Sequence, residues 1–114
     1  EQLRINFDLT IACFGHVGDG NIHVNIMVDP NDLHAVSRAA DAELQLFKEV
    51  VRLEGVISGE HGIGLSKRPF MKLGLSSAEL ALMSRLKRAF DPNGILNPGK
   101  IFPDCSQDDS ASIG

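Results

Sequence analysis

The sequence lacks tryptophan and tyrosine, and six phenylalanines are its only aromatic residues apart from histidine. Any core must therefore be built from Leu, Ile, Val and Phe, and the hydrophobic fraction of 43% is sufficient for one. The length of 114 residues fits a single domain. No apolar run approaches the roughly 20 residues of a transmembrane helix, so we expect no membrane span.

Positive charge is also scarce, because the net charge is −4 and the Lys and Arg residues form no cluster. Duplex nucleic acid needs a cationic face on its partner, so we exclude it as a ligand. Cys13 and Cys105 form no Cys-x-x-Cys pair, which favours two reduced thiols in a cytosolic type of protein. The chain opens with Glu1 and shows no secretory leader, and we expect a cytoplasmic fragment of a longer polypeptide.

Two alternating segments near the N-terminus predict a β-hairpin. In residues 6–14 apolar side chains alternate with more polar ones, and residues 15–20 form a glycine-rich turn. Residues 22–28 alternate again, with an apolar side chain at every second position. His23 and Asn25 therefore share the other face of the second strand.

Residues 33–53 predict a long amphipathic helix. Asp29-Pro30-Asn31-Asp32 is typical of a helix start, and Gly55 is the expected stop. We assign His34 and Arg38 to the polar side, and a lone His34 there is expected to be solvated. The apolar positions that recur at spacings of three and four are Leu33, Val36, Ala40, Leu44, Phe47 and Val51.

A second glycine-rich loop follows the long helix. Residues 56–58 predict a short strand, and residues 59–64 form the loop, Gly-Glu-His-Gly-Ile-Gly. Pro69 is expected to interrupt any regular element, because its ring removes a backbone donor. Lys67 and Arg68 are interpreted as ordinary exposed residues.

A second helix and a polar tail complete the chain. Ser76-Ser77-Ala78-Glu79 is a capping box, and the helix that it begins is expected to end at Asp91. A turn follows at Asn97-Pro98-Gly99, and the Ser- and Asp-rich residues 104–114 predict a disordered tail. The order of elements in residues 1–103 fits an α+β fold, in which helices cover one face of an antiparallel sheet, as in ferredoxin-like cap domains.

Two histidines and a glutamate form a candidate metal site. His16 and His23 bracket the hairpin turn, and Glu60 lies in the second glycine-rich loop. Two imidazoles and a carboxylate are a ligand set for Zn²⁺ or a similar divalent ion, and three protein ligands leave an open position, as in catalytic sites. The glycines of both loops allow the main chain to approach a ligand closely.

Each of these features also has a simpler interpretation. Two histidines on a hairpin are often surface residues, glycine-rich loops are often plain turns, and Asp19 suits a turn between glycines. Gly62-x-Gly64 lacks the full Gly-x-Gly-x-x-Gly pattern at a helix start, so we exclude a dinucleotide-binding fold. The coincidence of the histidines, Asn25 and the Glu60-His61 pair favours a functional site.

Four segments, taken in order, resemble one family. They are Gly-His-Val-Gly-Asp-Gly-Asn-Ile-His-Val-Asn (15–25), Ser-Gly-Glu-His-Gly-Ile-Gly (58–64), Lys-Arg-Pro-Phe (67–70) and Phe-Asp-Pro-Asn-Gly-Ile-Leu-Asn-Pro-Gly-Lys-Ile-Phe (90–102). Together they are similar to the C-terminal region of the FAD-linked oxidases of the vanillyl-alcohol-oxidase type. This family includes D-lactate dehydrogenase, the FAD-linked subunit of glycolate oxidase and D-2-hydroxyglutarate dehydrogenase.

The resemblance implies a role for each matching residue. The catalytic base, which removes the proton of the substrate hydroxyl and so also contacts substrate, would be His61. A second substrate contact would be Asn25. The metal ligands, with zinc as the expected ion, would be His16, His23 and Glu60, and the residues near the flavin would be Asn97 and, as a support of its turn, Lys100.

The resemblance also implies a function. The chain would be the substrate- and metal-binding part of an FAD-dependent oxidoreductase that converts a D-2-hydroxy acid to the 2-oxo acid. Alone it would be inactive, because FAD would be held mainly by an N-terminal FAD-binding domain. The enzyme would be cytoplasmic or peripheral to the inner membrane, and mitochondrial in a eukaryote.

Two alternatives come from other functional classes. One is a stand-alone module that binds a metal or a small acid without redox activity. The other is a domain that self-associates through exposed surface. The turn at Asn97-Pro98-Gly99-Lys100 favours the enzyme, because a pure binding module needs no turn that faces a flavin.

Overall fold

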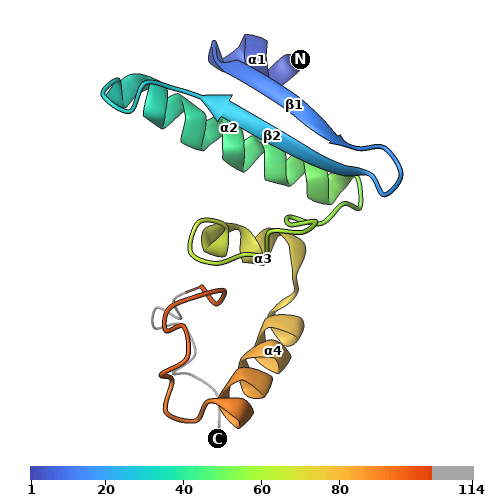
Figure 1. The fold of residues 1–114 in the computed structure, drawn as a ribbon, viewed down its shortest axis with the longest axis vertical. Coiled ribbons are helices and arrows are strands. Elements are labelled where there is room, and N and C mark those ends of the chain that lie inside the picture. Colours follow the sequence, from blue (N-terminus) through green and yellow to red (C-terminus); the bar gives the residue numbers. More distant parts are fainter. Residues whose placement is uncertain (104–114) are drawn as a thin grey trace, which may run out of the picture. The chain divides into compact units, whose positions relative to one another are not determined.

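The computed structural model of the protein describes residues 1–103, which fall into two compact units, Glu1–Gly62 and a second that begins at Ile63. The combination of helices with a two-stranded antiparallel sheet confirms the predicted α+β class. The expected tail, residues 104–114, lies outside the described residues. In chain order the elements are α1 (Gln2–Phe7), β1 (Thr10–His16), β2 (Asn21–Met27), α2 (Leu33–Arg52), the 3₁₀ helix η1 (Arg68–Phe70), α3 (Met71–Gly74) and α4 (Ser77–Phe90) (Figure 1).

The first unit is built on the hairpin of β1 and β2. The strands pair antiparallel, with Phe14 opposite His23 and His16 opposite Asn21. Because partners across an antiparallel pair lie on the same face, these four side chains project from one face of the sheet. The Asn21 N–H donates to Asp19 Oδ1 (3.0 Å), so Asp19 has the turn role that its glycine neighbours suggested.

The predicted strand over residues 6–14 is wrong at its N-terminal end. The segment Gln2–Phe7 is helical, and α1 ends at Asp8 in the left-handed conformation (φ 49°), which Asp tolerates better than most residues. Arg38 of α2 donates from Nε to the Phe7 carbonyl at the end of α1 (3.0 Å). The apolar alternation therefore crosses a helix–strand junction. Arg38, assigned to the polar side of α2, is half-buried at this contact.

Helix α2 runs alongside the hairpin in the first unit (Figure 1). The helix was predicted correctly, but its buried side is formed by Ala35, Ala42 and Phe47, while Leu33 is 77% exposed. Small alanine side chains let the helix backbone approach its neighbours closely, which a stripe of larger residues would prevent. Of the predicted apolar stripe, Phe47 is the residue that reaches the core.

Both ends of α2 are fixed by backbone hydrogen bonds. Asp32 accepts from the N–H groups of His34 and Ala35 (both 3.0 Å), and the Ala35 bond in particular holds the pKa of the Asp32 carboxyl below its ordinary value. At the other end the left-handed residue is Glu54 (φ 61°), not the expected Gly55. Gly55 is required because its backbone lies close to the last turn of α2, where a Cβ on residue 55 would lie 2.9 Å from Val50 Cγ1.

Two sequence predictions near the middle of the chain are wrong. Residues 56–58 form no strand. In the described residues β1 and β2 pair only with each other, so residues 56–58 have no neighbouring strand with which to form backbone hydrogen bonds. Ile57 is nevertheless buried. Pro69 does not interrupt regular structure but lies at the start of η1, where the missing N–H of proline is not needed.

The second unit contains η1, α3 and α4. The predicted capping box is confirmed, since Ser76 N–H donates to Glu79 Oε2 (2.8 Å) and Glu79 N–H donates to Ser76 Oγ (3.3 Å). The Ser76 hydroxyl also donates to Glu79 Oε2 (2.7 Å), and this bond, followed by that from the Ser76 N–H, lowers the pKa of the Glu79 carboxyl. The helix ends at Phe90 with Asp91 as its C-cap, as predicted. Among residues 1–103 no helix has both the length and the apolar character that crossing a membrane requires.

Candidate metal centre

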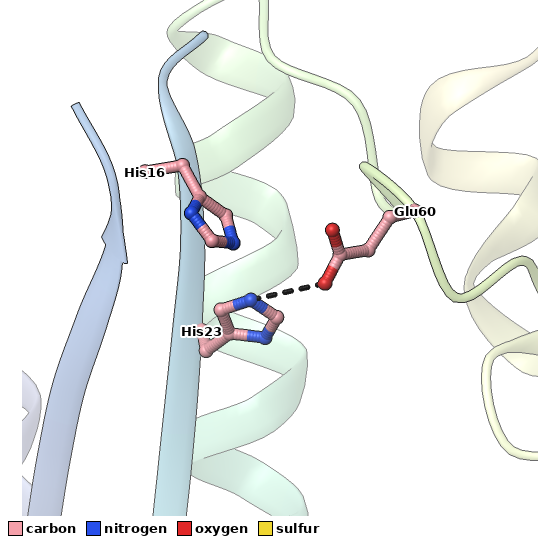
Figure 2. A group of neighbouring side chains, drawn as sticks. All are labelled: His16, His23 and Glu60. Atoms are coloured by element: carbon pink, nitrogen blue, oxygen red, sulfur yellow. Dashed lines mark ion pairs between the residues drawn. The ribbon is translucent and has the colours of Figure 1, made fainter. Parts of the chain in front are cut away.

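The three predicted metal ligands meet at the turn end of the hairpin. Ligand atoms of His16, His23 and Glu60 all lie within 4.8 Å of one another (Figure 2). His16 is the last residue of β1, His23 belongs to β2, and Glu60 lies in the loop after α2. The hairpin register therefore places both imidazoles on one face, and the second glycine-rich loop brings a carboxylate to it.

The donor set fits a divalent ion. In a tetrahedral site with bonds of about 2.0–2.1 Å, neighbouring donor atoms lie about 3.3 Å apart. His23 Nε2 is 3.1 Å from Glu60 Oε1, and no separation within the set exceeds 4.8 Å. Coordination would therefore need an inward movement of about 1.5 Å at most. Two imidazole nitrogens and one carboxylate oxygen also leave a position for a further ligand.

Glu60 lies between two imidazoles. Its Oε1 atom is 3.1 Å from His23 Nε2 and 3.2 Å from His61 Nε2, and each contact becomes an ion pair when the imidazole is protonated. The His23 ring also meets the rings of His16 and His61 edge-on, at centroid separations of 5.8 and 5.4 Å. One carboxylate thus contacts both a candidate ligand and the candidate base.

The exposure of these side chains differs. His23 is 19% exposed, Glu60 is 44% exposed and His61 is 71% exposed. In this unit the candidate ligand His23 is therefore held inside the cluster, whereas His61 is open to a molecule that arrives from solvent. This difference in exposure suits a site in which His61 acts on a substrate and His23 binds an ion.

Glycines at two positions allow close approach to Asn21, Gly15 within the hairpin and Gly59 from the second loop. A Cβ on Gly59 would lie 2.5 Å from Asn21 Oδ1, and a Cβ on Gly15 would lie 2.2 Å from the Asn21 carbonyl oxygen. Neither position accepts a side chain unless Asn21 moves. The Ser58 hydroxyl also donates to the Gly62 carbonyl (2.9 Å), which closes the short loop that contains Glu60 and His61.

Sequence reasoning missed three residues that shape the site. Phe14 stacks on the His23 ring, with a centroid separation of 5.0 Å and an interplanar angle of 16°. Asn21 lies against both glycine positions, and Ser58 closes the loop. Phe14 could have been found from the hairpin alone, because a turn centred between His16 and Asn21 places Phe14 opposite His23.

The other predicted site residues lie outside this cluster. Asn25 is exposed and shares the face of His23, two positions further along β2. Asn97 and Lys100 belong to the second unit, where Asn97 is exposed and has a left-handed backbone (φ 48°). Arg68, which we expected to be an ordinary exposed residue, is half-buried and donates to the Gly99 carbonyl (3.0 Å).

Comparison with known proteins identifies the family. Residues 1–101 match the model of the FAD linked oxidases, C-terminal domain, and the chain belongs to this family. It is 41% identical over 101 residues to the glycolate oxidase subunit GlcD of Bacillus subtilis, covering 89% of this chain and 22% of that protein. Identity to the D-2-hydroxyglutarate dehydrogenase of Stutzerimonas stutzeri is 42% over 99 residues, covering 83% of this chain and 21% of the relative.

A third relative is the protein named "Probable D-lactate dehydrogenase, mitochondrial" of Danio rerio. It is 38% identical over 98 residues, which cover 86% of this chain and 20% of the relative. The predicted resemblance is thus confirmed, and membership of an FAD-linked family implies FAD as the cofactor. The chain spans only about a fifth of the length of these curated relatives.

Proposed function

We propose that the chain is the substrate- and metal-binding part of an FAD-dependent oxidoreductase that oxidises a D-2-hydroxy acid to the 2-oxo acid. The observation that supports this most directly is the convergence of His16, His23 and Glu60 within 4.8 Å, with His61 in contact with Glu60. The names of the relatives point to glycolate, D-lactate and D-2-hydroxyglutarate, and all three are 2-hydroxy acids.

The ligand set suits an anionic substrate. A divalent ion, expected to be zinc, would supply a Lewis acid that binds the carboxylate and hydroxyl oxygens of the substrate and makes the hydroxyl more acidic. Two neutral imidazoles and one carboxylate contribute a charge of −1 to such a site. The site would then keep a net positive charge, which favours a carboxylate ligand.

His61 is proposed to take the proton of the substrate hydroxyl. Its side chain is exposed, and Glu60 Oε1 lies 3.2 Å from its Nε2 atom. The carboxylate would stabilise the imidazolium that forms, as an acid does for the histidine of other catalytic pairs. Asn25 would orient the substrate from the same face of β2.

The redox step requires a part of the protein outside this chain. FAD would supply the hydride acceptor. In this proposal Asn97 contacts the flavin ring, Lys100 supports the turn that contains it, and a preceding domain holds most of the cofactor. The isolated chain would then be inactive, and the complete enzyme would be cytoplasmic or peripheral to the inner membrane.

The test uses the full-length native product of the gene that encodes this sequence. Under anaerobic conditions D-lactate, glycolate or D-2-hydroxyglutarate should bleach the absorbance of the oxidised flavin. The variant His61→Gln should keep its metal and FAD but reduce the flavin at least about 100-fold more slowly, because it lacks the base. His34→Gln, at an exposed position at the start of α2, is the matched control. A wild-type protein that binds metal but is reduced by none of the three acids would favour the stand-alone binding module instead.

A further inference from the structure

The second unit contains a partly buried ion pair between Lys87 and Asp91, which the proposed function does not use. The Asp91 side chain is 3% exposed and pairs with Lys87 Nζ, one turn earlier on α4. Asp91 also accepts from the N–H groups of Ile95 and Leu96 (both 3.0 Å). Lys87 Nζ in turn donates to the Leu96 carbonyl (2.7 Å). Both charged groups therefore bond the segment that leads directly into Asn97.

The position of Asp91 indicates that its carboxylate stabilises the segment after α4 and not the helix itself. It is the C-cap of α4, where a negative charge meets the negative end of the helix dipole. A buried carboxylate is also unfavourable unless it is paired and hydrogen-bonded. The Lys87 ammonium lowers the pKa of Asp91 and keeps it ionised, and the carboxylate then accepts the backbone donors at Ile95 and Leu96.

The same turn is fastened at its other end. Arg68 Nη1 donates to the Gly99 carbonyl (3.0 Å), and the Ile101 N–H donates to the Gly64 carbonyl (2.9 Å). Between the two fastened ends lies Asn97, which is exposed and has φ 48°. Asn adopts this left-handed backbone more readily than most residues, and the hydrogen bonds on both sides of it fix the segment in which it lies.

We propose that Lys87 and Asp91 are positioning residues that hold the Asn97 side chain in place for the flavin. This inference rests on the proposed function, in which Asn97 contacts the flavin ring. The ion pair would act through the backbone of residues 95–96 and would touch neither substrate nor cofactor. Placement matters for the rate, because a shift of about 1 Å at a reacting group can slow a reaction about 100-fold.

The experiment compares Asp91→Asn and Lys87→Met in the full-length native gene product. The matched control is Glu49→Gln, which breaks the exposed ion pair between Glu49 and Arg52 on α2 (2.7 Å). Hydrogen exchange of residues 92–101 and the rate of flavin reduction per bound FAD are measured for each protein. Both test variants should exchange faster and reduce the flavin about 10- to 100-fold more slowly, with substrate KM and FAD content as in the wild type. Lys87→Arg, which keeps the charge, should recover most of the rate.

The outcomes separate this inference from the proposed function. Faster exchange with an unchanged reduction rate per bound FAD would overturn the positioning role and leave the proposed function intact. Unchanged exchange would show that the ion pair does not fasten the turn. If no 2-hydroxy acid reduces the wild-type flavin, the proposed function and the positioning role fail together, while exchange still reports on the turn. Should Asp91→Asn not fold, Lys87→Met decides, because it leaves the carboxylate and its two amide donors in place.

Discussion

His23 contacts more members of the candidate metal centre than any other residue described there. It lies 3.1 Å from Glu60, meets His16 and His61 edge-on, and has one ring face covered by Phe14. Replacing it by Gln keeps a polar side chain of similar length but removes the imidazole nitrogen that would bind an ion. We expect His23→Gln to abolish tight metal binding.

The magnitude follows from the ligand count. Removing a residue that only supports a ligand lowers metal affinity about 10- to 100-fold in other metal sites. His23 is itself one of three ligands, and its loss leaves only His16 and Glu60. The dissociation constant for Zn²⁺ should therefore rise by more than about 100-fold, which corresponds to about 2.7 kcal/mol or more of binding free energy.

The assay is competition for Zn²⁺ between the full-length native gene product and a chromophoric chelator. His34→Gln removes an exposed imidazole from the same unit and should bind Zn²⁺ like the wild type. His23→Gln should also lose flavin reduction by 2-hydroxy acids while its FAD content stays unchanged. A Zn²⁺ affinity equal to that of the wild type, within error, would refute the assignment of His23 as a ligand.

Three further predictions concern the backbone and the second unit. Gly15→Ala should lower the free energy of unfolding, measured in urea, by about 2–3 kcal/mol, because the new Cβ would meet the backbone of Asn21. Gly59→Ala should lower it by less, because its Cβ would meet the movable Asn21 side chain. Equal losses for the two variants would contradict this reasoning. Ser76→Ala should cost about 1 kcal/mol in the same assay, and no change would argue against the capping box. The pKa of Asp91 is lowered in the folded protein, so its ionised carboxylate stabilises the fold above the ordinary pKa of 3.8, and this stabilisation is lost as the pH falls through the lower folded pKa. The difference in melting temperature between the wild type and Asp91→Asn should therefore shrink on acidification. A constant difference would count against the ion pair.

Features that depend on neighbouring residues could be predicted from the sequence. Asp32 and Ser76 cap their helices because each needs only the N–H groups two or three residues ahead. His16 and His23 share a face because a short turn fixes the register of a hairpin and side chains alternate along a strand. Glu60 was proposed as the third ligand from its residue type and its glycine-rich loop, and the family resemblance implied the same role; the structure brings its carboxylate to the histidines.

Features that depend on distant contacts could not be predicted in this way. The residues before β1 alternate like a strand but form α1, whose last carbonyl is bonded by Arg38, 31 positions along the chain. The buried side of α2 is chosen by how closely the helix can approach its neighbours, so Ala42 is fully buried while Leu33 is exposed. Hydrophobicity alone ranks these two residues in the opposite order.

The glycines show most clearly what the structure adds to the pattern. In the sequence the glycines of both loops are equivalent, and each suggests a close approach or an unusual backbone. The structure separates them, because a Cβ on Gly15 or Gly59 would collide with Asn21, whereas a Cβ on Gly18 would meet nothing within 4 Å. The Gly15 contact is between the paired backbones of β1 and β2, whereas the Gly59 contact sets the Glu60 loop against the Asn21 side chain. Both contacts are made by Asn21, which pairs with His16 in the hairpin, so the lack of a Cβ at Gly15 and at Gly59 lets the candidate ligands come within reach of one another.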